Sequence, residues 1–286
     1  MAIKIIECPR DAMQGLHDFI PTATKIEYIN QLLKVGFDTI DFGSFVSPKA
    51  IPQLVDTAEV LANLDLANTT SKLLAIVANV KGAETAVQHP EIKYIGFPFS
   101  ISETFQQRNT NSSIAQSLET VKAIQALCVK NNKELVLYIS MGFGNPYGDV
   151  WNTEIVEKWV QEMHALGIKI ISLSDTIGIA NPDSISYLFK HLIPAFPTIE
   201  FGAHLHTTPN TWQEKIDAAY QNGCKRFDGA LKGFGGCPMA SDKLTGNMPT
   251  ENMFIRFNDL NEQTNINQDA FFNAMLLADK IFANAH

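Results

Sequence analysis

The chain has 286 residues, of which 45% are hydrophobic and 18% are charged, and this composition is typical of a globular protein with a sizeable core. Its 22 basic and 30 acidic side chains give a net charge of -8, which argues against nucleic acid as the main partner because phosphate binding needs clustered Lys and Arg. The sequence contains no apolar run of about 18 residues that could span a membrane, and residues 1–8 show no signal or presequence pattern. We therefore expect a cytoplasmic protein.

Short β-branched runs alternate with longer amphipathic segments along the whole chain. The predicted strands cover residues 3–7, 39–42, 73–77, 94–98, 135–140, 168–173, 199–204 and 226–229. The predicted helices include residues 22–34, 113–131, 153–166, 182–192 and 212–221, with start signals at Thr22, Thr153 and Asn181. Such alternation predicts βαβ units and a parallel sheet.

No internal repeat, low-complexity tract or long linker divides the chain, so we interpret residues 1–286 as a single catalytic barrel domain. Eight strand-helix units in this length predict the α/β class and a closed (β/α)8 TIM barrel, with residues 252–286 as a C-terminal helical extension. The alternative is an open doubly wound sheet, although no G-x-G-x-x-G motif follows the first strand. In a barrel, catalytic groups lie at the carboxyl ends of the strands.

Polar residues follow the first predicted strand directly. Arg10 offers a planar fork for a carboxylate or an enolate-like oxygen, and Asp11 is a hard oxygen ligand for a divalent cation. Gln14 follows a few residues later. On these residues alone, an exposed ion pair that opens a loop is the simpler interpretation.

Two further carboxylates stand at predicted strand ends. Asp41 ends the second strand and Asp175 follows the sixth. Either could cap the next loop or helix, but their shared position at the mouth of a barrel favours a functional role.

Two histidines stand at the end of the seventh predicted strand. His204 and His206 are two residues apart, so both rings face the same side of a strand and can bind one metal ion. Asn247, after the eighth strand, could add an amide oxygen or could be an ordinary turn residue. With Asp11, these residues form a mixed N/O set that suits Mg²⁺, Mn²⁺ or Zn²⁺ in octahedral coordination.

Four cysteines are present, without the short paired spacing of a zinc site and too few for a disulfide framework. We expect reduced thiols, with Cys8, Cys128 and Cys224 as packing residues. Cys237 follows three glycines within the segment 233–239, where a mobile loop could carry an exposed thiol that gives or takes a proton. The alternative is an ordinary glycine-rich turn with an incidental cysteine.

Taken together, these motifs resemble those of the hydroxymethylglutaryl-CoA lyase family, within the metal-dependent barrel lyases and synthases. The resemblance extends over nearly the whole chain. The motifs that carry it are Arg10-Asp11 with Gln14, the segment 44–49 (Ser-Phe-Val-Ser-Pro-Lys), the segment 175–178 (Asp-Thr-Ile-Gly), His204-x-His206 and the segment 235–238 (Gly-Gly-Cys-Pro). The last of these separates the lyases from the related synthases.

The resemblance implies a carbon-carbon lyase that cleaves 3-hydroxy-3-methylglutaryl-CoA into acetyl-CoA and acetoacetate. It implies a divalent cation, Mg²⁺ or Mn²⁺ with Zn²⁺ as the alternative, a CoA thioester substrate, a role in leucine catabolism and a homo-oligomer, expected to be a dimer. The implied metal ligands are Asp11, His204, His206 and Asn247. The implied catalytic residues are Arg10 for the enolate, Cys237 for the protonation of carbon, and Asp41 and Asp175 for orientation, while Asp11 or His204 takes the hydroxyl proton. The expected substrate contacts are Arg10 and Gln14, with Asn109 and Asn111 added by position alone.

The sequence departs from the family pattern mainly on the substrate side. Asp41 stands where Glu is usual, and the segment 136–138 (Val-Leu-Tyr) replaces Arg-Gly-Tyr, which removes the expected partner of Asp175. Two alternatives therefore remain open. One is a synthase that condenses acetyl-CoA with a 2-oxo acid, and the other is a barrel that binds a CoA ester without converting it.

Overall fold

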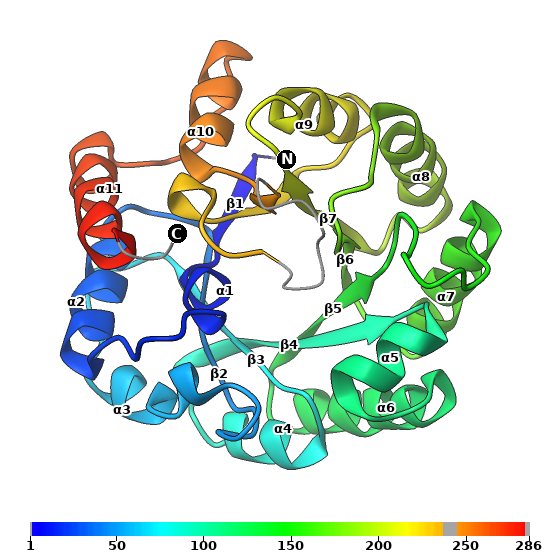
Figure 1. Ribbon diagram of the computed structural model, residues 1–286, viewed down its shortest axis with the longest axis horizontal. Helices are drawn as coiled ribbons and strands as arrows, with labels where there is room; N and C mark the ends of the chain where they lie inside the picture. Colours follow the sequence, from blue (N-terminus) through cyan, green and yellow to red (C-terminus); the bar gives the residue numbers. More distant parts are fainter. Residues whose placement is uncertain (1, 237–244, 284–286) are drawn as a thin grey trace.

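Eight parallel strands form a closed barrel in the computed structural model, which describes residues 2–236 and 245–283 (Figure 1). The strands are β1 (Lys4–Glu7), β2 (Thr39–Ser44), β3 (Lys72–Ile76), β4 (Ile92–Ser100), β5 (Glu134–Ser140), β6 (Ile170–Asp175), β7 (Glu200–Thr207) and β8 (Arg226–Gly229). Each strand pairs in parallel with the next, and β8 pairs with β1. The predicted TIM barrel is confirmed, and the open doubly wound alternative is wrong because the β1–β8 pairing closes the sheet.

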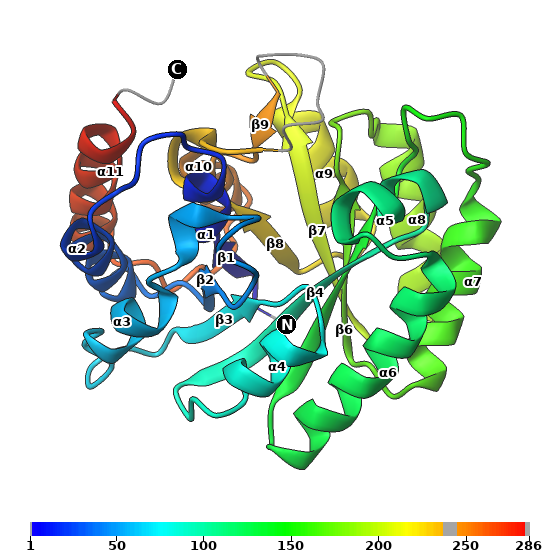
Figure 2. The same ribbon diagram turned by 60° about the horizontal axis from the view of Figure 1, so that its bottom comes forward.

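Helices surround the strands in an outer ring (Figures 1 and 2). The ring contains α2 (Thr22–Leu33), α3 (Thr57–Ala62), α4 (Val80–Ala86), α6 (Ile114–Lys130), α7 (Thr153–Ala165), α8 (Pro182–Ala195), α9 (Trp212–Gln221), α10 (Thr250–Asp259) and α11 (Gln268–Phe282). Short helices follow strand ends or loops, namely α1 (Pro9–Gln14), α5 (Glu103–Thr110) and the 3₁₀ turns η1 (Pro52–Leu54) and η2 (Leu231–Gly233). All five predicted helices are confirmed.

Two of the three predicted helix start signals are wrong in detail. The side chain of Asn152, not Thr153, caps α7 by accepting a hydrogen bond from the backbone N–H of Ile155. Thr22 is the first residue of α2 and not its cap, because Pro21 occupies the N-cap position and offers no side-chain hydrogen bond. Asn181 does cap α8, in a capping box with Ser184.

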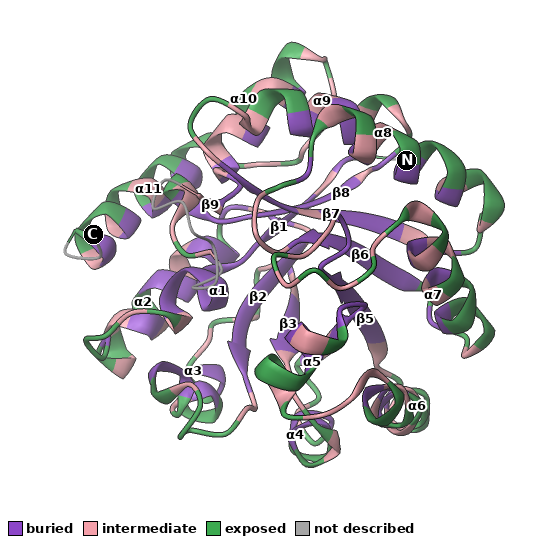
Figure 3. Cartoon of the chain, turned by 45° about the vertical axis from the view of Figure 1, so that its right-hand side comes forward, coloured by how far each residue is buried: buried purple, intermediate pink, exposed green. Residues whose placement is uncertain are grey.

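The core has two layers, one between the strands and the helices and one inside the barrel. The strands are buried along their length, whereas the helices expose their outer faces (Figure 3). Inside the barrel, an apolar cluster fills the space below the strand ends; it contains Leu74, Tyr94, Val136, Tyr138 and Ile170. This cluster is the floor beneath the polar residues at the carboxyl ends of the strands.

The thiols of Cys8, Cys128 and Cys224 are free and buried, as expected for packing residues. Burial raises the pKa of each of them. These three side chains therefore stay protonated at neutral pH and are poor nucleophiles.

The C-terminal part of the described chain is helical, as predicted. Helix α11 packs on α2, where Phe282 meets Tyr28 edge to face. Within residues 2–236 and 245–283, none of the helices combines the length and apolar character needed to cross a membrane.

Candidate active site

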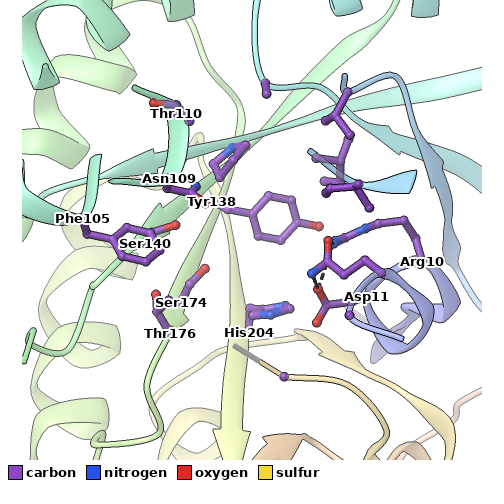
Figure 4. A pocket seen from close by; sticks show the side chains of 18 of the residues that line it. Arg10, Asp11, Phe105, Asn109, Thr110, Tyr138, Ser140, Ser174, Thr176 and His204 are labelled. Atoms are coloured by element: carbon purple, nitrogen blue, oxygen red, sulfur yellow. Dashed lines mark hydrogen bonds and ion pairs between the residues drawn. The ribbon is translucent and has the colours of Figure 1, made fainter. Parts of the chain in front are cut away.

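A cavity of about 440 Å³ opens at the carboxyl ends of the strands. Arg10, Asp11, Tyr138 and His204 all point into it (Figure 4). Its apolar wall includes Val46, Ile51, Ile76, Pro98 and Phe105. The cavity is therefore strongly polar next to β1 and β7, and elsewhere its lining mixes apolar side chains with polar ones such as Asn109 and Ser140.

The structure brings together three of the four predicted metal ligands. Ligand atoms of Asp11, His204 and His206 all lie within 4.8 Å of one another. Asp11 comes from α1, directly after β1, and the two histidines face the same side of β7.

Asn247, the fourth predicted ligand, lies beside this cluster. The short strand β9 (Gly246–Asn247) runs antiparallel to β7 and sets Asn247 opposite His206. The side chain of Asn247 donates a hydrogen bond to the carbonyl of Phe234 at 2.8 Å and is also hydrogen-bonded to Asp11. The four side chains therefore share one corner of the cavity.

The histidine rings are oriented as metal ligands require. Nδ1 of His206 donates to the carbonyl of Thr176 at 3.0 Å, and Nδ1 of His204 donates to Oδ2 of Asp228 at 3.2 Å. These contacts leave Nε2 of each ring free to bind a cation. Nε2 of His206 is buried and has no hydrogen-bond partner among the described residues, as expected of an atom whose partner is a bound ion.

The protonation states also suit a cation. Burial and the neighbouring His204 lower the pKa of His206 to about 4, so its ring is neutral. Burial alone would raise the pKa of Asp11, but Arg10, the two histidines and the hydrogen bond from Asn247 together lower it to about 2. A carboxylate and a neutral imidazole are the ligand forms that Mg²⁺ and Mn²⁺ accept, so the residues fit a divalent cation.

Arg10 is held rigidly beside this cluster. Its Nε donates to Asp41 at 3.0 Å, and Nη2 donates to the same carboxylate. Its Nη1 donates to Asp11 at 2.8 Å and to Gln14 at 2.9 Å. A guanidinium group has five N–H donors, and four of them are used in these contacts, which leaves one N–H on Nη2.

Asp41 lies behind Arg10 and not on the cavity surface. Its side chain is 1% exposed, and its carboxylate makes an ion pair with Arg10. Burial raises the pKa of Asp41 to about 6, against the opposite effect of Arg10. The hydrogen bonds of this carboxylate come from Arg10, so its main structural role is to orient the guanidinium group.

Asp175 is also buried outside the cavity lining. Its Oδ2 accepts a hydrogen bond from Nζ of Lys215 at 2.8 Å, and its Oδ1 accepts one from the backbone N–H of Ala180 at 3.0 Å. Lys215, from α9, also donates to the carbonyl of His206 at 2.7 Å. Asp175 therefore has a partner, although not one from β5, and this ion pair fixes the ends of β6 and β7 relative to each other.

The remaining predicted residues are divided. Gln14 and Asn109 line the cavity, whereas Asn111 does not and ends α5 in a left-handed conformation with φ of 53°. Cys237 lies outside the described residues. Their roles as substrate or catalytic contacts stay predictions.

Asp228 and Lys215 are functional neighbours that our sequence reasoning missed. Asp228 occupies the inward-facing position of β8 that pairs in register with His204 on β7. Its signal in the sequence is an acidic residue inside the predicted strand 226–229, where an unpaired charge would be costly. The signal of Lys215 is a lysine on the buried face of an amphipathic helix.

Comparison with known proteins agrees with this site. The HMGL-like family model matches residues 2–277. A hydroxymethylglutaryl-CoA lyase of Bacillus subtilis is 34% identical over 266 residues, which is 93% of this chain and 88% of the relative, and an (R)-citramalyl-CoA lyase of Chloroflexus aurantiacus is 30% identical over 96% of this chain and 89% of the relative. The structure of the HMG-CoA lyase from Brucella melitensis superposes with a TM-score of 0.92 at 29% identity and covers 99% of each chain. The chain therefore belongs to the HMGL-like family and is, as predicted, a carbon-carbon lyase of the hydroxymethylglutaryl-CoA lyase type.

Proposed function

We propose that this protein is a divalent-metal-dependent lyase that cleaves 3-hydroxy-3-methylglutaryl-CoA into acetyl-CoA and acetoacetate. The observation that carries the proposal is the cluster of Asp11, His204 and His206 within 4.8 Å, with Arg10 hydrogen-bonded to Asp11 in the same cavity. A cation site next to a preorganised guanidinium group suits a reaction in which one oxygen loses a proton and a second oxygen gains negative charge. The relatives named hydroxymethylglutaryl-CoA lyase support the same reaction.

The cation would be held by Asp11, His204, His206 and Asn247. When bound, a divalent cation supplies Lewis-acid polarisation of the substrate oxygens that face it. The apolar side chains of the lining would limit the access of water to the reacting carbons.

The bond changes assign roles to the polar residues. A base takes the proton of the tertiary hydroxyl, the C2–C3 bond breaks, and its electron pair forms the enolate of acetyl-CoA while the C3 oxygen becomes the ketone of acetoacetate. Asp11 or His204 is the base. Nδ1 of His204 donates to Asp228 and its Nε2 would bind the cation, so His204 could take a proton only by giving up one of these contacts.

The enolate oxygen then needs a donor, and its carbon needs a proton. The N–H of Arg10 that is left over from its contacts with Asp41, Asp11 and Gln14 would stabilise the oxygen. Cys237 would deliver the proton to carbon, as the family resemblance implies.

A second substrate follows from one of the comparisons. The (R)-citramalyl-CoA lyase relative covers almost the whole of this chain, and a solved HMG-CoA lyase of 31% identity and TM-score 0.90 from Acinetobacter baumannii is in complex with coenzyme A and 3-methylmalate. Citramalyl-CoA also carries a tertiary hydroxyl and a free carboxylate, so the same residues could act on it.

The decisive experiment offers the purified protein each thioester with Mg²⁺ or Mn²⁺ and identifies the products. Acetoacetate and acetyl-CoA from hydroxymethylglutaryl-CoA, at a higher kcat/KM than for citramalyl-CoA, would support the proposal. Preferred cleavage of citramalyl-CoA would make that thioester the substrate. Release of CoA from acetyl-CoA plus a 2-oxo acid would favour the synthase. Tight binding without turnover would favour the non-catalytic barrel.

Several finer expectations accompany this proposal. They are Mg²⁺ or Mn²⁺ as the cation with Zn²⁺ as the alternative, a dimer, a location in the cytoplasm and a role in leucine catabolism. The cation, the dimer and the pathway rest on the family resemblance, and the location stays a prediction.

A further inference from the structure

Glu7 is a buried acidic residue that the proposed reaction does not use. It ends β1, and its side chain faces the outside of the barrel, because the preceding residue Ile6 pairs with the inward-facing Asp228. Glu7 itself pairs with Gly229. Its relative exposure is 0%, so the carboxyl group lies entirely between β1, β8 and the elements that cover them.

The carboxyl group of Glu7 joins two segments that are far apart along the chain. Oε1 accepts a hydrogen bond from the backbone N–H of Leu231 at 2.9 Å, and Oε2 is hydrogen-bonded to the hydroxyl of Thr250 at 2.6 Å. Leu231 begins η2 and Thr250 begins α10. The glycine at position 229 permits this approach, since a Cβ there would lie 2.9 Å from Oγ1 of Thr250.

Asn247 lies between these two anchor points. The backbone N–H of Ala230 donates to the carbonyl of Met248 at 3.0 Å, and that of Thr250 donates to the carbonyl of Ala230 at 3.2 Å. The side chain of Asn247 closes the same arrangement by donating to the carbonyl of Phe234. The described stems 230–235 and 245–250 therefore form one hydrogen-bonded unit, and Glu7 ties this unit to β1.

The charges around Glu7 do not compensate a carboxylate. Among the described residues, no cationic side chain forms an ion pair or hydrogen bond with it. Glu251 of α10 and Tyr28 of α2 face it, and Lys232 of η2 is engaged with Asp279 of α11 at 3.2 Å. Burial raises the pKa of Glu7 to about 8, with Glu251 adding to the effect and the bonds from Thr250 and Leu231 opposing it.

We propose that Glu7 is a positioning residue, whose neutral carboxyl group clamps the stems 230–235 and 245–250 to the barrel and thereby sets Asn247 opposite His206. The neutral acid keeps both contacts, because a threonine hydroxyl group can donate or accept. Ionisation strengthens the two hydrogen bonds but leaves an uncompensated buried charge beside Glu251, and the larger cost of burying this charge favours opening of the clamp. The inference rests on the proposed function only in assigning Asn247 to the cation.

The test compares three variants with the wild type. Glu7→Gln has the shape and hydrogen bonds of the neutral acid, Glu7→Leu has neither hydrogen bond, and Thr250→Val removes one of them. Thr57→Val is the matched control, since the buried hydroxyl of Thr57 donates to Leu54 in another part of the barrel. The first measurement is amide hydrogen exchange of residues 245–250, and the second is the dissociation constant of Mn²⁺ without substrate.

We expect Glu7→Leu and Thr250→Val to exchange residues 245–250 at least tenfold faster than the wild type and to bind Mn²⁺ more weakly. Glu7→Gln and Thr57→Val should match the wild type at about pH 7. At about pH 8.5 the protection factors of residues 245–250, which correct for the faster intrinsic exchange at high pH, should fall in the wild type but not in Glu7→Gln, because glutamine cannot ionise.

Unchanged exchange in both Glu7→Leu and Thr250→Val would overturn the clamp, as would equal acceleration in Glu7→Gln and Glu7→Leu. If Glu7→Leu does not fold, Thr250→Val decides, because it keeps the volume of the side chain. Exchange of residues 245–250 needs neither metal nor substrate. A wild-type protein without lyase activity would therefore contradict the proposed function, whereas the clamp would still be judged by the exchange of residues 245–250.

Discussion

The guanidinium of Arg10 is the group on which the rate should depend most. Its side chain is 10% exposed and is fixed by Asp41, Asp11 and Gln14. The one remaining N–H can therefore bind the enolate oxygen without further loss of side-chain conformational entropy. In Arg10→Gln, a neutral amide replaces this charge and is too short to reach the same place. The buried Asp41 also loses its partner and should take up a proton.

The expected loss follows from the cost of removing one preorganised donor from a developing oxyanion, about 3 to 4 kcal/mol. This corresponds to roughly a 10²- to 10³-fold fall in kcat. The assay measures acetoacetate from hydroxymethylglutaryl-CoA at saturating Mn²⁺, together with the Mn²⁺ dissociation constant. The affinity for Mn²⁺ should be retained, because Asp11 and the histidines remain.

A conservative variant separates the effect of orienting Arg10 from the effect of its charge. Asp41→Asn keeps Arg10 and one hydrogen-bond acceptor, so its kcat should fall less than that of Arg10→Gln. A loss of less than about tenfold in Arg10→Gln would refute the enolate role of Arg10. Loss of Mn²⁺ binding in that variant would instead show that Arg10 holds the cation site together.

Four further outcomes test other parts of the account. His206→Ala should abolish stoichiometric metal binding, measured by metal analysis of the dialysed protein, and an unchanged metal content would contradict the ligand assignment. Asp228→Ala should weaken metal binding by about 10- to 100-fold in calorimetry, because the carboxylate orients the ring of His204, and Asp228→Asn should recover part of the affinity. Equal affinities in the wild type and both variants would argue against this role. Lys215→Met should lower the free energy of unfolding by about 3 to 5 kcal/mol, since it leaves Asp175 as an unpaired buried charge, and a denaturant midpoint like that of the wild type would count against the ion pair. The folded pKa of Glu7 lies above its unfolded value of 4.5, so its contribution to stability should fall as the pH rises from about 4.5 to about 8, by up to about 1.4 kcal/mol per pH unit; parallel stability curves for wild type and Glu7→Gln would contradict that shift.

The barrel was predictable because the hydrophobic period is a local property. Most of the buried strands are short apolar runs rich in β-branched residues, and the long helices show one apolar face. Helices α1, α3, α4 and α5 span only six to eight residues, which is too short for a helical period to emerge. The cap of α7 was misassigned by one residue, since neighbouring Asn and Thr give the same signal, whereas α2 begins after Pro21 without any side-chain cap.

The cluster of Asp11, His204 and His206 was predictable from the same kind of reasoning, whereas the residues that support it were not. Strand period alone puts His204 and His206 on one side of a strand, and barrel topology brings Asp11 to the same end. The contacts of Asp228 and Lys215 depend on the register between neighbouring strands and on how the helices pack against them, which the sequence pattern does not reveal. The substitution at Val136 suggested that Asp175 lacked a partner, but Lys215 of α9, the helix after β7, reaches it from another direction.

The dependence of hydroxymethylglutaryl-CoA cleavage on the cation tests the central claim most directly. Acetoacetate and acetyl-CoA should be measured with the metal-stripped wild type, with the same protein after addition of Mg²⁺ or Mn²⁺, and with His206→Ala under both conditions. The account predicts equal amounts of both products from the metal-loaded wild type and almost none from the other samples. Full cleavage by the stripped protein or by His206→Ala, or no cleavage by the folded, metal-loaded wild type, would contradict it.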